Sequence, residues 1–233
     1  MKKFLFIGNS ATYVNKIPET LALLAGDAGF DVTVTSIVKG GYELSRHADP
    51  SDEYGARVFA ALSAGYDAVF LQDNGSCITS DEKRAACRDA CRTLARAAQA
   101  SGAKVYIYVR PPYGKQLAEL ASFDQCRELD VLFTDIAREI GAECVFVNRA
   151  FAHAIKEGEL ELWGDDNAHT SRIGGYLAVC TFFATLFDAS ASTLDACGFT
   201  PEQARAVWEI ADKVALRGEG IPTLTDDAAL DRA

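Results

Sequence analysis

The sequence lacks the features that mark several common classes of protein. No run of lysine and arginine gathers into a basic stripe, and the formal net charge is −10. Proteins bind phosphate backbones through clustered cations, so neither nucleic acid nor another polyanion is an expected partner. The glycine-rich motifs G-x-G-x-x-G and Walker A are absent too, which removes the better-known nucleotide sites.

Signals for export and for membrane insertion are also missing. The first apolar run, residues 4–7, is broken at once by Gly8-Asn9-Ser10, whereas a secretory signal needs about 7–15 apolar residues. No stretch reaches the roughly 18 apolar residues of a membrane span. We therefore expect a cytoplasmic protein that does not bind membranes.

Cysteine is plentiful, but its spacing matches no zinc motif and its number is odd. The seven residues are Cys77, Cys87, Cys91, Cys126, Cys144, Cys180 and Cys197. Cysteines in apolar or helical segments behave as small hydrophobic residues in a reducing compartment. A chain of 233 residues that is 49% hydrophobic can also bury a core without a disulfide or metal. The sequence predicts free thiols, no metal and no cofactor.

Short apolar runs rich in β-branched and aromatic residues alternate with longer stretches of helical periodicity. The first, third and fifth runs lack polar alternation, which is typical of strands buried on both faces of a parallel sheet. The runs predict strands at Phe4–Ile7, Val32–Val38, Ala68–Leu71, Lys104–Val109 and Cys144–Val147.

Capping residues and glycines mark the helices between and after these strands. We expect helices at Pro18–Ala28, Asp81–Ala100 and Asp124–Ile140, one from Thr170 or Ser171 to Leu186, and one starting near Thr200-Pro201. Alternating strands and helices predict an α/β fold, a flavodoxin-like three-layer α/β/α sandwich around a five-stranded parallel sheet. One domain over residues 1–217 is enough, and 218–233 are expected to form a loose tail.

Ligands of such sheets bind beyond the carboxyl ends of the strands. Ser10 directly follows the first strand, so its hydroxyl is expected at this functional edge. By itself the observation is weak, because Ser10, Thr12 or Asn9 could simply cap the following helix. For an isolated serine the capping interpretation is the stronger one.

With only three histidines, the search for a general base is short. His153 is expected on a helix at the edge of the sheet, with a surface role, and His47 follows the second strand. Asp166 precedes His169 by three residues, a spacing that lets a carboxylate accept from one ring nitrogen while the other faces a nucleophile. A capping loop with a solvated histidine explains the Asp-x-x-His pattern equally well.

Two further segments at the functional edge carry backbone or amide donors. Gly40 and Gly41 follow the second strand and permit close approach of a ligand to the backbone. Gln72-Asp73-Asn74-Gly75 follows the third strand and offers side-chain amides. Each could also be an ordinary turn, since Asn-Gly is a frequent turn sequence.

Together these segments make a complete set for acyl transfer. In their order along the chain they resemble the SGNH, or GDSL-like, hydrolases, whose four blocks are named after Ser, Gly, Asn and His. Gly8-Asn9-Ser10 resembles the first block, Gly41 the second, Asn74 the third and Asp166-x-x-His169 the last. The resemblance runs from about residue 3 to about 188 and points to a poorly characterised bacterial branch. The usual third block is Gly-x-Asn-Asp, from which this chain departs on both sides of the asparagine.

The resemblance implies a serine hydrolase acting on ester bonds. Ser10 would be the nucleophile, His169 the base and Asp166 the orienting carboxylate, with Asp165 as its competitor. The N–H groups of Ser10 and Gly41 and the amide of Asn74 would form the oxyanion hole. Whether Gly40 or Gly41 donates stays open.

The expected substrate is a small acyl ester, with acetyl esters and acetylated sugars as candidates. His47, Tyr13 and Gln72 are candidates for substrate binding, and further pocket candidates are Tyr42, Tyr108, Arg110 and Tyr113. Two alternatives stay open: a flavodoxin-like module that binds phosphate at the helix after the first strand, and an SGNH-shaped protein that binds acyl ligands without turnover. The sequence does not set the oligomeric state.

Overall fold

A parallel sheet forms the centre of the protein in the computed structural model, which describes residues 1–114 and 120–224. Its strands are β1 (Lys2–Gly8), β2 (Val32–Val38), β3 (Ala68–Leu71), β4 (Lys104–Val109) and β5 (Glu143–Phe146). The order across the sheet is β2-β1-β3-β4-β5, and every neighbouring pair is parallel. The expected five-stranded parallel sheet is confirmed.

The side chains of β1 show why helices cover both faces. Successive side chains of a strand point to opposite faces, and here Phe4 and Phe6 join one hydrophobic cluster while Leu5 and Ile7 join another. The second cluster includes α4 (Glu53–Leu62), α5 (Asp81–Ala100) and most of α6 (Ser122–Ile140). The first includes α2 (Ile17–Asp27), α7 (Val147–Glu157), α8 (Arg172–Phe187) and α9 (Pro201–Ala215).

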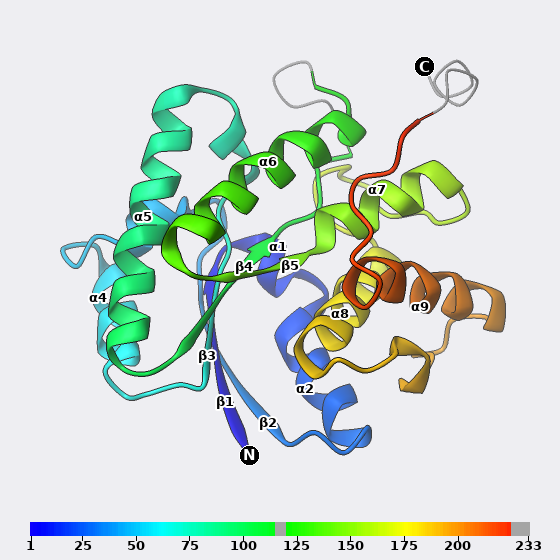
Figure 1. Cartoon of the computed structure of the whole chain (residues 1–233), viewed down its shortest axis with the longest axis horizontal. Coiled ribbons are helices and arrows are strands. Elements are labelled where there is room, and N and C mark those ends of the chain that lie inside the picture. The colour runs from blue at the N-terminus through cyan, green and yellow to red at the C-terminus, as the bar shows by residue number, and fades with distance from the viewer. Residues whose placement is uncertain (115–119, 225–233) are drawn as a thin grey trace.

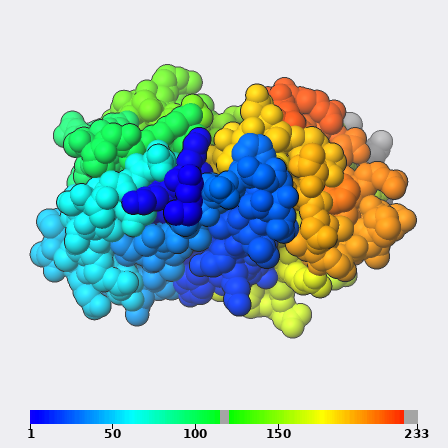
Figure 2. All heavy atoms as spheres, turned by 90° about the horizontal axis from the view of Figure 1, so that it is seen from below, coloured from blue at the N-terminus to red at the C-terminus, as the bar shows by residue number. Residues whose placement is uncertain are grey.

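Figure 1 shows these helices on opposite sides of the sheet, which is the predicted three-layer α/β/α sandwich. Figure 2 looks at the edge where the strands begin. There the first residues of the chain, in dark blue, lie between cyan and green segments on one side and yellow and orange segments on the other. The carboxyl ends of the strands are therefore at the opposite edge, where the candidate residues lie.

Capping residues fix several helix starts where the sequence predicts them. Ser80 caps α5 by accepting from the N–H of Lys83, and Ser171 caps α8. Thr200 opens α9 with a capping box completed by Gln203. Each such cap satisfies N–H groups that have no partner within the helix, so the local sequence defines these boundaries.

The structure departs from the sequence prediction at the end of β5. This strand stops at Phe146, and Val147 already belongs to α7. α4 and the short α3 (Leu44–His47) were not predicted, and neither were the 3₁₀ turns η1 (Val14–Lys16), η2 (Gly75–Ile78) and η3 (Ala191–Thr193). Within the described ranges, no helix is both long and apolar enough to cross a membrane.

The surface role expected for His153 is wrong. His153 lies on α7, is only 8% exposed, and has its Nε2 atom 3.0 Å from the carbonyl oxygen of Gly220. Ile221 and Leu224 pack against the adjoining core cluster. The start of the predicted loose tail is therefore packed onto α7, whereas residues 225–233 lie outside the described chain.

Candidate active site

Ser10 begins the four-residue helix α1 (Ser10–Tyr13), directly after β1. Its neighbour Asn9 is the cap of this helix: Asn9 Oδ1 accepts from the N–H of Ala11 at 3.1 Å. Ser10 is half-buried, and its hydroxyl has no hydrogen-bond partner in the described part of the chain. The capping explanation therefore applies to Asn9, and the Ser10 hydroxyl is left available at the functional edge.

Gln72 is hydrogen-bonded to the loop that carries Ser10 and lies on its buried side. Its Oε1 atom accepts from the N–H of Asn9 and from the Thr12 hydroxyl, both at 2.9 Å. A Cβ atom on Gly8 would lie 2.5 Å from this oxygen, so only glycine leaves room for the contact. Gln72 is 1% exposed, and its amide nitrogen donates to the carbonyl of Asp73. Both ends of the amide are thus bonded within the protein, which contradicts the predicted contact with substrate. It is a positioning residue.

The glycine pair lies in a turn beside the same loop. The N–H of Tyr42 donates to the carbonyl of Lys39 at 3.1 Å, and Gly41 has a φ of 73°, which favours glycine. Asn9 Nδ2 donates to the carbonyl of Tyr42 at 2.9 Å and thus ties the turn to the Ser10 loop. Both glycines are exposed, so a ligand can approach their backbone.

Asn74 begins η2 at the end of β3, next to β1 in the sheet. Its Oδ1 atom accepts from the N–H of Ser76 at 3.0 Å and from the Tyr113 hydroxyl at 3.2 Å. These two bonds fix the amide, and its Nδ2 atom lies 3.4 Å from the carbonyl oxygen of Gly41. The second and third sequence blocks therefore meet, as an oxyanion hole requires.

The base loop, residues 164–171, carries the Asp-x-x-His pair. Asp166 Oδ2 lies 2.5 Å from His169 Nδ1, and Oδ1 accepts from the N–H groups of Ala168 and His169 at 2.9 Å each. These hydrogen bonds, that of the His169 backbone first, hold the pKa of Asp166 well below its usual range. Asp165 is exposed and makes no such contact, so the geometry favours Asp166 as the orienting residue.

Bonds to two other segments hold the base loop at this edge. Trp163 pairs with Thr170 in a β-bridge, and its indole N–H donates to the carbonyl of Pro112 at 3.1 Å. Asn15 Nδ2 donates to the carbonyl oxygens of Thr170 at 2.8 Å and Ser171 at 3.0 Å. Because Asn15 closely follows α1, the loop is anchored to the segment that carries Ser10.

His169 and the Ser10 hydroxyl are not hydrogen-bonded to each other in the described residues. Such bonds are often long in ligand-free enzymes and tighten when substrate binds. His169 has a side-chain exposure of 37%, which leaves its free ring nitrogen accessible.

His47 lies beneath the site. It is completely buried on α3, with Nε2 2.9 Å from the carbonyl oxygen of Gly8, and burial lowers its pKa. This complete burial contradicts the predicted substrate contact. A neutral imidazole donates to the last carbonyl of β1 and helps to set the course of the Ser10 loop.

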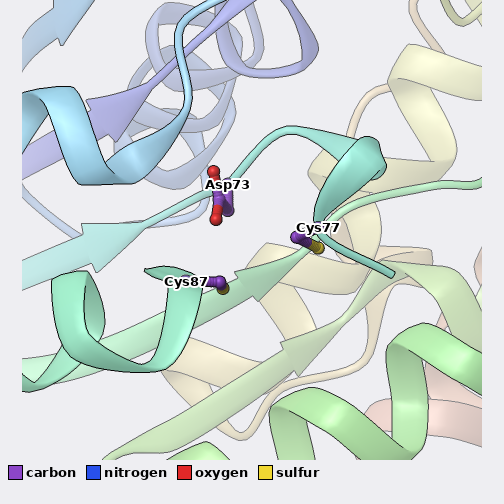
Figure 3. Close-up of side chains that lie close together, drawn as sticks. All are labelled: Asp73, Cys77 and Cys87. Atoms are coloured by element: carbon purple, nitrogen blue, oxygen red, sulfur yellow. The ribbon is translucent and has the colours of Figure 1, made fainter. Parts of the chain in front are cut away.

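A second buried group lies under η2. Asp73, Cys77 and Cys87 lie close together (Figure 3), with one oxygen or sulfur atom of each within 4.8 Å of the others, so in the described chain this is the group that could hold a metal ion. Two thiols and a carboxylate would suit zinc. The Cys87 thiol hydrogen-bonds with Asp73, which also accepts from the N–H groups of Leu44 and Asn74, so the carboxyl group already has partners within the protein. Burial raises the pKa of Asp73. The sequence contains no zinc motif here, because the two thiols come from separate elements, η2 and α5.

All seven cysteines are free thiols, and five of them are buried. Tyr13, another predicted substrate residue, is 44% exposed and lies beside Gly40. Its role stays a prediction.

Many solved structures are similar to this chain, among them the following three. A protein of Slackia heliotrinireducens, provisionally assigned to the SGNH hydrolases, is 28% identical with a TM-score of 0.65, covering 76% of this chain and 95% of that one. A DUF4886 family protein of Bacteroides uniformis is 16% identical with a TM-score of 0.80, covering 97% and 98%. The acetylxylan esterase Axe2 of Geobacillus stearothermophilus is 16% identical with a TM-score of 0.59, covering 78% and 92%.

Neither a family model nor a curated protein matches the sequence. The fold and the likeness to the Slackia protein make this chain an SGNH-hydrolase-like enzyme, as the four sequence blocks predict. The alignment with the Bacteroides protein covers nearly the whole chain. The shared fold therefore extends beyond residue 188, where the sequence resemblance ends, and includes α9.

Proposed function

We propose that this SGNH-hydrolase-like chain is a serine esterase that hydrolyses small acyl esters through an acyl-enzyme on Ser10. The observation that carries the proposal is the Asp166–His169 pair, with its oxygen–nitrogen distance of 2.5 Å, on a loop anchored beside the Ser10 segment. A nucleophile, a base and an orienting carboxylate on one edge suit acyl transfer.

The reaction proceeds in two steps. His169 Nε2 takes the proton of the Ser10 hydroxyl as Oγ bonds to the ester carbonyl carbon, and Asp166 stabilises the imidazolium. The tetrahedral intermediate collapses, the ester C–O bond breaks, and His169 returns the proton to the leaving alcohol. Water then attacks the acyl-enzyme by the same route and releases the acid and free Ser10.

The negative charge on the carbonyl oxygen needs donors at fixed positions. We assign this role to the N–H groups of Ser10 and Gly41 and to the amide of Asn74. Support comes from the contact between Asn74 Nδ2 and the Gly41 carbonyl, which brings the two segments together. Gly41 is favoured over Gly40 because its positive φ fixes the orientation of the adjacent peptide units.

Acetyl esters, including those of acetylated carbohydrates, are the substrates we assign. One similar structure is an acetylxylan esterase, and the exposed Tyr13 ring beside Gly40 offers a flat surface for a sugar. The free thiols suit a reducing compartment, so we place the enzyme in the cytoplasm. A phosphate site at α1 is disfavoured, because Asn9 already occupies the N–H of Ala11.

A chain-length series of p-nitrophenyl esters, together with acetylated sugars, tests the proposal on wild type and Ser10→Ala. Among these unsubstituted acyl groups we expect the acetyl ester to give the highest kcat/KM, and we expect Ser10→Ala to lose at least about 10³-fold. Equal turnover by the two proteins would reject the serine mechanism. A preference for long acyl chains would reject the acetyl assignment alone.

A further inference from the structure

We infer that Arg110 binds a carboxylate group carried by the acyl part of the substrate, close to the reacting carbonyl. This inference rests on the proposed serine-esterase function and extends its substrate class beyond the acetyl group. Among short acyl groups, those that carry one carboxylate near the ester are expected to be better substrates than acetyl. The observation that carries it is a buried arginine without a polar partner at the edge of the oxyanion hole.

Arg110 follows the last residue of β4 and is only 4% exposed. In the part of the chain that the structure describes it forms no hydrogen bond and no ion pair, and its Nε atom is buried without a partner. Its one strong contact is the face of the Tyr113 ring, 3.9 Å from the guanidinium carbon. Burying an unpaired charge is costly, and ring stacking offsets only part of that cost.

Arg149, a half-buried arginine elsewhere in the protein, provides a comparison for Arg110. It also stacks on an aromatic ring, that of Phe146, at 3.5 Å. In addition it donates to both carboxylate oxygens of Asp130, at 2.6 and 3.3 Å. Arg110 has the ring but lacks the carboxylate, so a carboxylate from outside the chain would complete the same arrangement.

The guanidinium lies against the oxyanion segment. A Cβ atom on Gly75 would be 2.4 Å from Arg110 Nη1 and 2.6 Å from the Tyr113 ring, so the absence of a side chain at Gly75 makes room for the stacked pair. Gly75 directly follows Asn74, and the Tyr113 hydroxyl donates to Asn74 Oδ1 at 3.2 Å. A group bound by Arg110 is therefore only a few atoms from a carbonyl bound by Asn74.

The charge balance favours a carboxylate over a phosphate. The planar guanidinium matches either group in a bidentate fork. A carboxylate carries one negative charge, which a single arginine neutralises, whereas a phosphate monoester carries about 1.5 to 2 at pH 7. The remaining negative charge of a bound phosphate would be unfavourable in a protein whose formal net charge is already −10.

The test compares p-nitrophenyl hydrogen succinate with p-nitrophenyl methyl succinate, which replaces the carboxylate by a neutral ester. Malonate and glutarate analogues vary the distance between the carboxylate and the reacting carbonyl. The proteins are wild type, Arg110→Met, and the matched control Arg149→Met, which also loses a stacked arginine. Thermal melting confirms that each variant is folded.

We expect wild type to favour the hydrogen succinate by about 10- to 100-fold in kcat/KM. Arg110→Met should abolish this preference, so that its ratio of kcat/KM for the two esters is close to 1, and Arg149→Met should keep the preference. Equal use of both esters by wild type, or a preference that survives in Arg110→Met, would overturn the inference.

A binding experiment separates this inference from the esterase proposal. Monomethyl succinate, a carboxylate with a neutral ester, is titrated into Ser10→Ala and into Ser10→Ala/Arg110→Met by calorimetry. Binding that is lost with Arg110 would support the carboxylate site whatever the turnover of wild type. A wild-type protein that cleaves no ester would reject the esterase alone. Equal titration curves for the two variants would reject the carboxylate site.

Discussion

The two sides of the candidate site are stabilised in different ways. On the nucleophile side, the segment that carries Ser10 is hydrogen-bonded to buried polar residues, whereas the base loop is exposed and is stabilised mainly by hydrogen bonds within itself. Beneath Ser10, Gln72 and His47 are 1% and 0% exposed, and each bonds the backbone of the Ser10 segment. Asp166, by contrast, is half-exposed and bonds chiefly to its own loop. Substitutions of these two buried residues should therefore lower stability, and substitutions in the base loop should affect activity alone.

The largest expected effect lies in the base loop. Asp166→Asn should lower kcat by about 10⁴-fold, because an amide can no longer fix the imidazole tautomer and stabilise its charged form. The melting temperature should stay close to that of wild type, because the aspartate is exposed. Kinetics with p-nitrophenyl acetate and thermal melting measure both quantities.

Asp165→Asn is the matched control for this change, one residue away on the same loop. It should retain nearly full turnover. If Asp165→Asn abolished turnover and Asp166→Asn did not, the two aspartates would have to exchange roles. If Asp166→Asn unfolded the protein, the base loop would not be the independent unit described above.

Asn74→Asp separates stability from activity on the nucleophile side. The aspartate keeps the oxygen that caps η2 by accepting from Ser76, but it loses the amide donor. We expect kcat to fall by about 10²- to 10³-fold with little change in the free energy of unfolding. Unchanged kcat in this variant would remove Asn74 from the oxyanion hole.

Gln72→Met tests the buried support of the nucleophile. Loss of the amide oxygen leaves the N–H of Asn9 and the hydroxyl of Thr12 without their acceptor, which should lower the free energy of unfolding by about 1–3 kcal/mol. Urea denaturation measures this change. The same substitution at the exposed Gln99 should cost less than about 0.5 kcal/mol. An equal loss of unfolding free energy in Gln72→Met and Gln99→Met would contradict the proposed role of Gln72 as a buried support of the Ser10 segment.

His47 should give the smallest effect, a pH dependence of stability. Burial lowers its pKa in the folded state, so the unfolded chain takes up the proton more readily. The contribution of His47 is present above the unfolded pKa of about 6.5 and is lost as pH falls below it toward the folded pKa. His47→Gln should flatten the urea stability curve between about pH 7 and 5. A slope that the substitution leaves unchanged would contradict a buried, neutral His47.

Much of the fold follows from local sequence. β2, β3 and β4 begin and end as predicted, because their apolar runs stop at glycine or polar residues. α5 also matches, because Ser80 caps one end and the chain turns at Gly102 after the other. The end of β5 was missed, because the apolar character continues through Val147 into α7, and period alone does not separate a buried strand from a buried helix.

The candidate site was predictable in part. The four blocks identify the catalytic candidates, because chain order carries over from a resemblance. The resemblance does not indicate how deeply a side chain is buried, so Gln72 and His47 were predicted to contact substrate. A signal existed for Gln72, which directly continues the fully buried strand β3 and so is expected to be enclosed. The sequence could not predict that Arg110 lacks a polar partner, because this depends on which acidic side chains the fold places near it.

Labelling with a fluorophosphonate tests the central claim most directly, because this reagent reacts only with an activated serine. After incubation, intact mass and peptide mapping should show one adduct, located on Ser10. His169→Ala should label far more slowly, and Ser10→Ala should not label. An unmodified wild-type protein, or an adduct of equal yield in Ser10→Ala, would contradict the assignment of Ser10 as the nucleophile.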